Sequence, residues 1–68
     1  MNRYRVSYYH LAYGGKEIVL NDSLVAARHW QIDKSVDTLM FYDMDFAITA
    51  VFKWSLVVSF NMVEKDSG

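Results

Sequence analysis

Apolar residues occupy every second position over residues 40–62. The even positions are all apolar or aromatic: Met40, Tyr42, Met44, Phe46, Ile48, Ala50, Phe52, Trp54, Leu56, Val58, Phe60 and Met62. The odd positions are mostly polar or small. A period of two is typical of a strand with one buried face, whereas a helix would spread these residues around its whole surface. Charges at Asp43, Asp45 and Lys53 interrupt the segment. The pattern therefore predicts sheet with its even face inward, not a membrane-spanning helix.

Residues 40–62 are too many for one strand of a small domain, because a strand of this length would extend about 76 Å. Asp43-Met44-Asp45 is expected to form a three-residue loop that pairs Tyr42 with Phe46, since aspartate carboxylates bond nearby backbone N–H groups in turns. We expect a second break near Phe52–Ser55, with a long bent strand as the alternative.

Arg3–Tyr13 also has the character of a strand. Either a β-bulge near Tyr8-Tyr9 switches its inward parity, or the even positions stay inward and leave Tyr9, Leu11 and Tyr13 exposed. Gly14-Gly15 lies between two strand-like runs and predicts a hairpin, with Lys16–Leu20 as the second strand.

Asp22 is a candidate N-cap for a helix over residues 23–33. Val25, His29 and Ile32 follow the i, i+4, i+7 spacing of an amphipathic helix. The expected fold is α+β: an antiparallel sheet of four to five strands with one helix on one face, in the order ββαββ or ββαβββ. We expect a single domain over residues 1–68, with residues 64–68 as a flexible tail.

Composition narrows the possible functions. The chain has 68 residues, no cysteine and a net charge of −1. Disulfides and thiolate zinc sites are excluded, and the basicity typical of duplex-DNA binding is absent. MNRYRVSYY has no apolar signal-peptide core, so we expect a cytoplasmic protein without membrane association. The hydrophobic content of 53% exceeds the usual range and suggests an interface.

No pattern indicates catalysis, a cofactor or a metal, so we expect neither an enzyme nor a metalloprotein. Asp43 and Asp45, with Asp37 nearby, favour a turn over a cation site because they lack the ligand spacing of calcium loops. His29 is interpreted as a histidine at the edge of the core, and His10 as a surface or binding residue, because no second group is identified for acid–base work.

The residues expected to bind a partner are Arg3, Arg5, Tyr9, Tyr13 and Lys53. Tyrosine and arginine are enriched in protein interfaces and also hold single-stranded nucleic acid. The net charge favours a protein partner, and nucleic acid is the less favoured ligand. Lys53 has a simpler role as well, since lysine on an edge strand discourages aggregation.

The element order, with KEIVLNDSLVAARHW leading from the second strand into the expected helix, resembles that of small phage-encoded proteins such as type I anti-CRISPR proteins. The resemblance implies a non-enzymatic inhibitor that docks on a bacterial defence complex; it assigns no individual residue. The alternatives are a self-associating structural or accessory homodimer and a single-stranded nucleic-acid binder.

Overall fold

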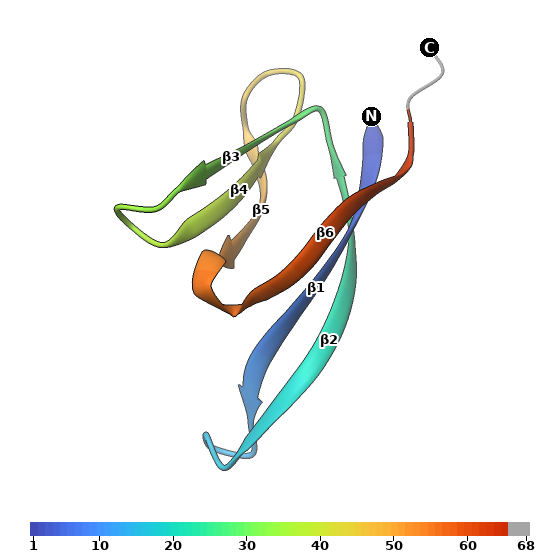
Figure 1. Cartoon of the computed structure of the whole chain (residues 1–68). Helices are drawn as coiled ribbons and strands as arrows, with labels where there is room; N and C mark the ends of the chain where they lie inside the picture. The colour runs from blue at the N-terminus through green and yellow to red at the C-terminus, as the bar shows by residue number, and fades with distance from the viewer. Residues whose placement is uncertain (66–68) are drawn as a thin grey trace.

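The computed structural model describes residues 1–65 and shows strands joined by turns and a single 3₁₀ turn (Figure 1). The elements are β1 (Asn2–Ala12), β2 (Glu17–Ala27), β3 (His29–Asp33), β4 (Thr38–Tyr42), β5 (Ile48–Lys53), the 3₁₀ turn η1 (Trp54–Leu56) and β6 (Val57–Glu64). They form two three-stranded antiparallel sheets, ordered β2-β1-β6 and β3-β4-β5. Glu64, which the sequence assigned to a flexible tail, belongs to β6. Residues 66–68 of that expected tail lie outside the described part.

The chain passes from one sheet to the other at Arg28, the one residue between β2 and β3. The backbone N–H of Arg28 donates to the carbonyl of Tyr42 at 2.7 Å, which ties the corner to β4. The expected helix over residues 23–33 is therefore wrong: this segment is the end of β2, the corner and all of β3. The α+β class is wrong with it, since no α-helix covers a sheet among the described residues.

A change of inward parity at the corner explains the false helical signal. Val25 and Ala27 are buried on β2, whereas Trp30 and Ile32 point toward the other strands from β3. Each strand alternates normally, but the inward positions change from odd to even across Arg28. The inward residues are therefore spaced by two, three and two positions: Val25, Ala27, Trp30 and Ile32. Within a short window this spacing resembles the period of a helix. Pairing with β1 and β4 overrides the local preference.

The core lies between the two sheets. Its buried side chains come from β1, β2 and β4: Tyr4, Val6, Val25, Ala27, Leu39 and Phe41. Phe41 of β4 links the layers, because its ring lies 5.3 Å from that of Tyr4 in β1 and 6.1 Å from that of Phe60 in β6. Both sheets thus share one apolar cluster.

The parity expected for residues 40–62 holds only in part. The segment is sheet, as predicted, and Ala50 and Phe52 pack against the core. In β4, however, the odd residue Phe41 is fully buried, and the even residues Met44 and Ile48 are exposed. The five-residue loop over 43–47 keeps the parity, because it pairs Tyr42 with Ile48. The phase changes at the irregularity that follows, where Thr49 has no partner and Phe41 pairs with Ala50.

Residues 40–62 contain two breaks between strands, the loop over residues 43–47 and η1. Tyr42 pairs with Ile48 rather than with Phe46, so the expected three-residue loop is too short. Asp43 nevertheless organises the loop: its Oδ1 accepts the backbone N–H groups of Asp45 and Ala47, both at 2.9 Å. The break expected near Phe52–Ser55 is confirmed by η1.

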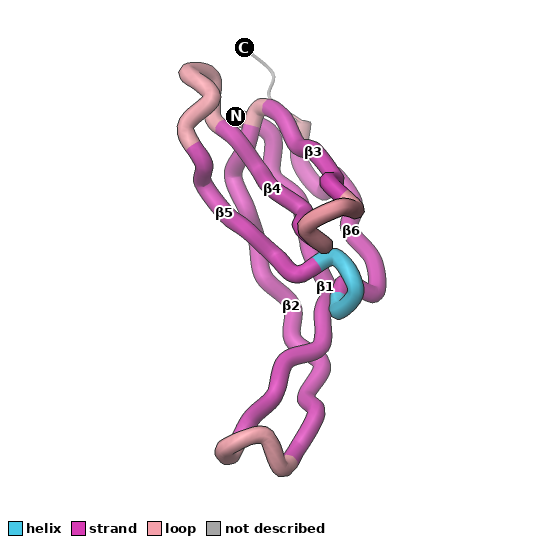
Figure 2. Tube along the Cα trace, turned by 90° about the vertical axis from the view of Figure 1, so that its left-hand side faces the viewer, coloured by secondary structure: helices cyan, strands magenta, loops and turns pink. Residues whose placement is uncertain are grey.

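The β1–β2 hairpin extends beyond the third strand of its sheet, β6. Gly14 and Gly15 both adopt positive φ in its turn, which confirms the predicted hairpin. β6 pairs with β1 only as far as Tyr8, whereas the pairing of β1 with β2 continues to the pair Ala12–Glu17. Residues 9–20, called the arm below, therefore project as two strands beyond the body of the molecule (Figures 1 and 2).

Candidate protein-binding face on the arm

The hairpin register gathers four large apolar side chains on one face of the arm. Tyr9 lies opposite Leu20, and Leu11 lies opposite Ile18. These positions have the opposite parity to Tyr4, Val6 and Val25, which fill the core, so they point to the outer side of the sheet. We call Tyr9, Leu11, Ile18 and Leu20 the arm face.

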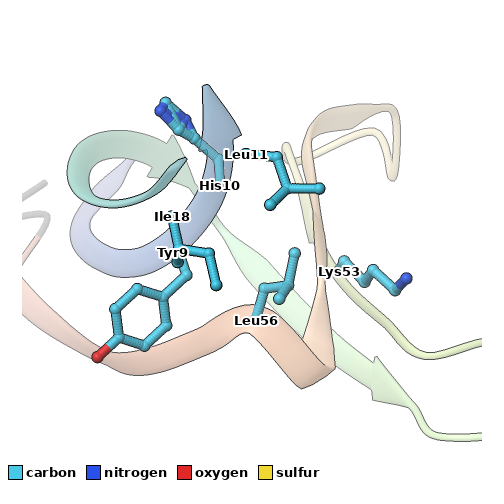
Figure 3. A pocket seen from close by; sticks show the side chains of 6 residues that line it. All are labelled: Tyr9, His10, Leu11, Ile18, Lys53 and Leu56. Atoms are coloured by element: carbon cyan, nitrogen blue, oxygen red, sulfur yellow. The ribbon is translucent and has the colours of Figure 1, made fainter. Parts of the chain in front are cut away.

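The 3₁₀ turn η1 adds a fifth apolar side chain. Leu56 lines a shallow hollow together with residues of the arm and the end of β5: Tyr9, His10, Leu11, Ile18 and Lys53. Figure 3 shows Leu11 and Leu56 on facing sides of this hollow, with Tyr9 toward one end and Lys53 toward the other. The lining is mainly apolar, and the charge of Lys53 lies at its rim.

The arm face is uncovered. Ile18 is 71% exposed and Leu11 is 66% exposed, although both belong to regular strands. At roughly 200 Å² for each large side chain, the arm face and Leu56 leave on the order of 500 Å² accessible. That is about a tenth of the total surface of 4889 Å² and near the upper end for the largest apolar patch of a monomer.

Polar cross-strand contacts hold the other face of the arm. The ring Nε2 of His10 lies 3.2 Å from the side-chain nitrogen of Asn21, and the Tyr8 hydroxyl lies 3.1 Å from that of Ser23. These side chains are partly buried. The arm therefore has an apolar outer face and an inner face whose polar groups bond across the hairpin.

The structure separates the five residues expected to bind a partner. Tyr9 and Lys53 line the same hollow, although they come from β1 and β5. Tyr13 lies in the turn at the tip of the arm and is 77% exposed. Arg3 and Arg5 occupy the other end of β1, where the Arg3 guanidinium lies 3.9 Å from the Glu64 carboxylate in an exposed ion pair.

Sequence reasoning missed Ile18, Leu20 and Leu56. The signal for the first two was present, because a two-residue loop at Gly14-Gly15 gives the observed register and places both residues opposite Leu11 and Tyr9. Of the two interpretations of β1, the one that leaves Tyr9, Leu11 and Tyr13 exposed is confirmed. The irregularity near Tyr8 affects the pairing of β1 with β6 and does not change the inward parity of β1. Leu56 had no such signal, because its position depends on how η1 folds back.

The remaining candidates have structural explanations. His29 is exposed at the start of β3 rather than at the edge of the core, and its ring stacks on Phe46 with a centroid separation of 4.8 Å. The Asp43 carboxylate serves its own loop, and that of Asp37 binds Ser55. Within residues 1–65, no group of three or more histidine or acidic side chains is arranged to hold a metal.

No family model, curated protein or solved structure matches this chain. In the described part of the chain, none of the elements is a helix of the length and apolarity needed to cross a membrane.

Proposed function

We propose that this chain is a non-enzymatic binding domain that docks on a protein partner through the arm face. The observation that carries the proposal is the pairing of Tyr9 with Leu20 and of Leu11 with Ile18 on an uncovered, projecting hairpin. Water contact with this much apolar surface is unfavourable by roughly 25 cal/mol for each Å². A partner that covers the face removes that contact.

The chemistry around the face fits a protein better than nucleic acid. Its centre is apolar and aromatic, and Lys53 and His10 lie at the rim, as in protein interfaces with an apolar core and a polar edge. A nucleic-acid groove would need cations alternating with stacking rings. Arg3 and Arg5 lie in the half of β1 away from the arm, so they do not alternate with Tyr9 and Tyr13, which weakens that alternative.

The expected likeness to phage-encoded inhibitors depended on an element order that included a helix. Because residues 23–33 form strands, the shared element order no longer supports the likeness. Docking on a bacterial defence complex stays a prediction, and identification of the bound partner addresses it directly.

The proposal is tested by capture with a variant of the arm face. Leu11→Glu places a charge at the centre of the face, and Val51→Glu is the matched control because Val51 is an exposed strand residue on β5. Tagged forms of wild type and both variants are used as bait, after circular dichroism has confirmed that each is folded. We expect the wild type and Val51→Glu to retain the same protein, and Leu11→Glu to lose it.

Retention of the same protein by all three baits would show that the arm face is not the docking surface. A retained nucleic acid whose affinity falls steeply with salt would favour the nucleic-acid alternative instead.

A further inference from the structure

The outer edge of β2 in the arm is free to pair with another strand. β2 is the end strand of its sheet, and within residues 1–65 it pairs with β1 alone. The β3-β4-β5 sheet approaches the arm at Lys53, the end of β5, while the tip of the hairpin extends away from that sheet (Figures 1 and 2). The side chains of Asn21, Asp22 and Ser23 bond to His10, Ser7 and Tyr8 of β1, on the side away from this edge. A free edge presents unpaired backbone N–H and carbonyl groups to any strand that fits.

The arm also lacks the support of a third strand. Beyond Tyr8 only β1 and β2 remain paired, because β6 has already turned away. An isolated two-stranded hairpin is marginally stable in water, whereas three or more strands hold together. A strand added to β2 would therefore stabilise the arm as well as satisfy its edge.

We propose that the β2 edge pairs with the β2 edge of a second copy of this chain, antiparallel and centred on Val19. A two-fold axis at Val19 places it opposite Val19 of the second copy. Ile18 then lies opposite Leu20 of the second copy, and Lys16 lies opposite Asp22 of the second copy. Apolar residues meet apolar residues, and two pairs of opposite charges flank them.

Neighbouring registers that keep the faces aligned lack this complementarity. A shift of the axis to Leu20 places Ile18 opposite Asp22, and a shift to Ile18 places Lys16 opposite Leu20. An axis at Glu17 places two carboxylates against each other, which is unfavourable for directly opposed residues. Among these four registers, the one centred on Val19 places apolar residues opposite apolar residues and a lysine opposite an aspartate.

The charges of the chain permit this association. A net charge of −1 gives two copies almost no overall repulsion. Asp22 uses Oδ1 to accept the Ser7 hydroxyl across the hairpin, so its other oxygen serves as the acceptor for Lys16 of the second copy. Lys16 is exposed as the last residue of the turn that closes the hairpin, directly before β2, and its backbone N–H donates to the carbonyl of Tyr13.

The joined sheet would run β6-β1-β2 in one copy and continue through β2-β1-β6 in the other. Because the two-fold axis is perpendicular to the sheet, both arm faces would lie on the same side. This inference goes beyond the proposed function, since the dimer forms through the backbone edge of β2 and needs no foreign partner. Ile18 and Leu20 belong both to the arm face and to the paired edge, whereas Tyr9 and Leu11 belong to the arm face on β1.

A single introduced cysteine tests the register, because the chain contains no cysteine of its own. In Val19→Cys the two Cα atoms would lie about 4.5–5.5 Å apart across the axis, within reach of a disulfide. Leu24→Cys is the matched control: it is exposed on the same strand, but five residues from the axis its two copies would be about 33 Å apart. We expect mild oxidation of the purified chain to give covalent dimers for Val19→Cys and not for Leu24→Cys.

Charge reversal provides a second readout by sedimentation equilibrium. Lys16→Asp and Asp22→Lys should each weaken wild-type dimerisation about tenfold, since each change replaces two attractive pairs with repulsive ones. The double variant should recover most of that loss. Equal disulfide yields for Val19→Cys and Leu24→Cys, or a wild type that sediments as a monomer at every concentration, would overturn the proposal. Neither result would affect capture of a foreign protein through Leu11, so the two proposals fail separately.

Discussion

The carboxylate of Asp37 accepts two hydrogen bonds from Ser55, one from the backbone N–H at 2.8 Å and one from the hydroxyl at 2.6 Å. The Asp37 carbonyl also accepts the backbone N–H of Trp54 at 2.9 Å. One residue in the β3–β4 turn thus fixes η1, which carries Leu56 beside the arm. Asp37 has a φ of +53°, a conformation that aspartate, asparagine and glycine tolerate better than other residues.

Asp37→Ala should lower the free energy of unfolding by about 2–3 kcal/mol, because it removes the bonds to Ser55 and places alanine at positive φ. Asp37→Gly removes the same bonds but relieves the backbone strain, so its loss should be smaller by about 1 kcal/mol. Urea denaturation of both variants measures the difference. Equal losses would show that the left-handed conformation contributes nothing at this position.

Phe41→Ala should be the most damaging single change in the core. The ring is fully buried and contacts aromatic rings from both sheets, so its loss should cost about 3–5 kcal/mol. A domain of this size has only about 3–10 kcal/mol of stability, and the variant should be largely unfolded at 37 °C by circular dichroism. Val51→Ala, at an exposed position on the adjacent strand, is the control and should melt within a few degrees of the wild type.

Asp33 should make stability depend on pH in the acid range. Its Oδ1 accepts the Ser35 hydroxyl at 2.6 Å and the Ser35 backbone N–H at 3.0 Å, and these bonds hold the pKa of Asp33 below its usual value of 3.8. A carboxyl with a lowered pKa in the folded state stabilises the fold above its unfolded pKa, and that contribution disappears as pH falls through the folded pKa.

Ser35→Ala should therefore raise the pKa of Asp33, measured by NMR titration of its carboxyl carbon. The variant should be less stable than the wild type at pH 7, and the difference should vanish in acid below the folded pKa. A stability difference of the same size at pH 7 and at pH 2 would assign the effect of Ser35 to something other than the Asp33 carboxylate.

Tyr13 occupies the tip of the arm with a φ of +54° while its side chain is exposed. Asparagine adopts this conformation more readily than tyrosine, so Tyr13→Asn should raise the melting temperature by several degrees, equivalent to about 0.5–1 kcal/mol. If Tyr13 belongs to the docking surface, the same variant should bind its partner more weakly. A lower melting temperature would show that the tyrosine ring makes stabilising contacts that outweigh its backbone strain.

Local signals in the sequence were sufficient for the turns and for much of the strand content. Gly14-Gly15 marked the hairpin, because glycine adopts positive φ without steric cost. Asp43 marked the β4–β5 loop, although the loop is longer than expected, since its side chain bonds the local backbone in several loop lengths. Alternation over residues 46–54 identified β5 but could not reveal that β4 has the opposite inward parity.

The helix prediction failed because its evidence was local and the deciding interactions were not. Residues 23–27 pair with the first strand, about twenty positions earlier, and residues 29–33 pair with β4. The partner strands lie outside residues 23–33, so the sequence of this segment alone does not indicate either pairing. The change of inward parity at Arg28 then gave the window a helical spacing.

The sequence by itself determined a chain without cysteine, nearly neutral, rich in strand-forming residues and divided by recognisable turns. Only the tertiary structure decided that the chain enters a second sheet after β2 and which of the apolar residues fill the core. It also decided that Ile18, Leu20 and Leu56 gather beside Tyr9 and Leu11. The physical reason is that composition and turn chemistry act within a few residues, whereas burial depends on which distant strand each segment meets. Side chains of the same type therefore become core in one strand and exposed surface in another.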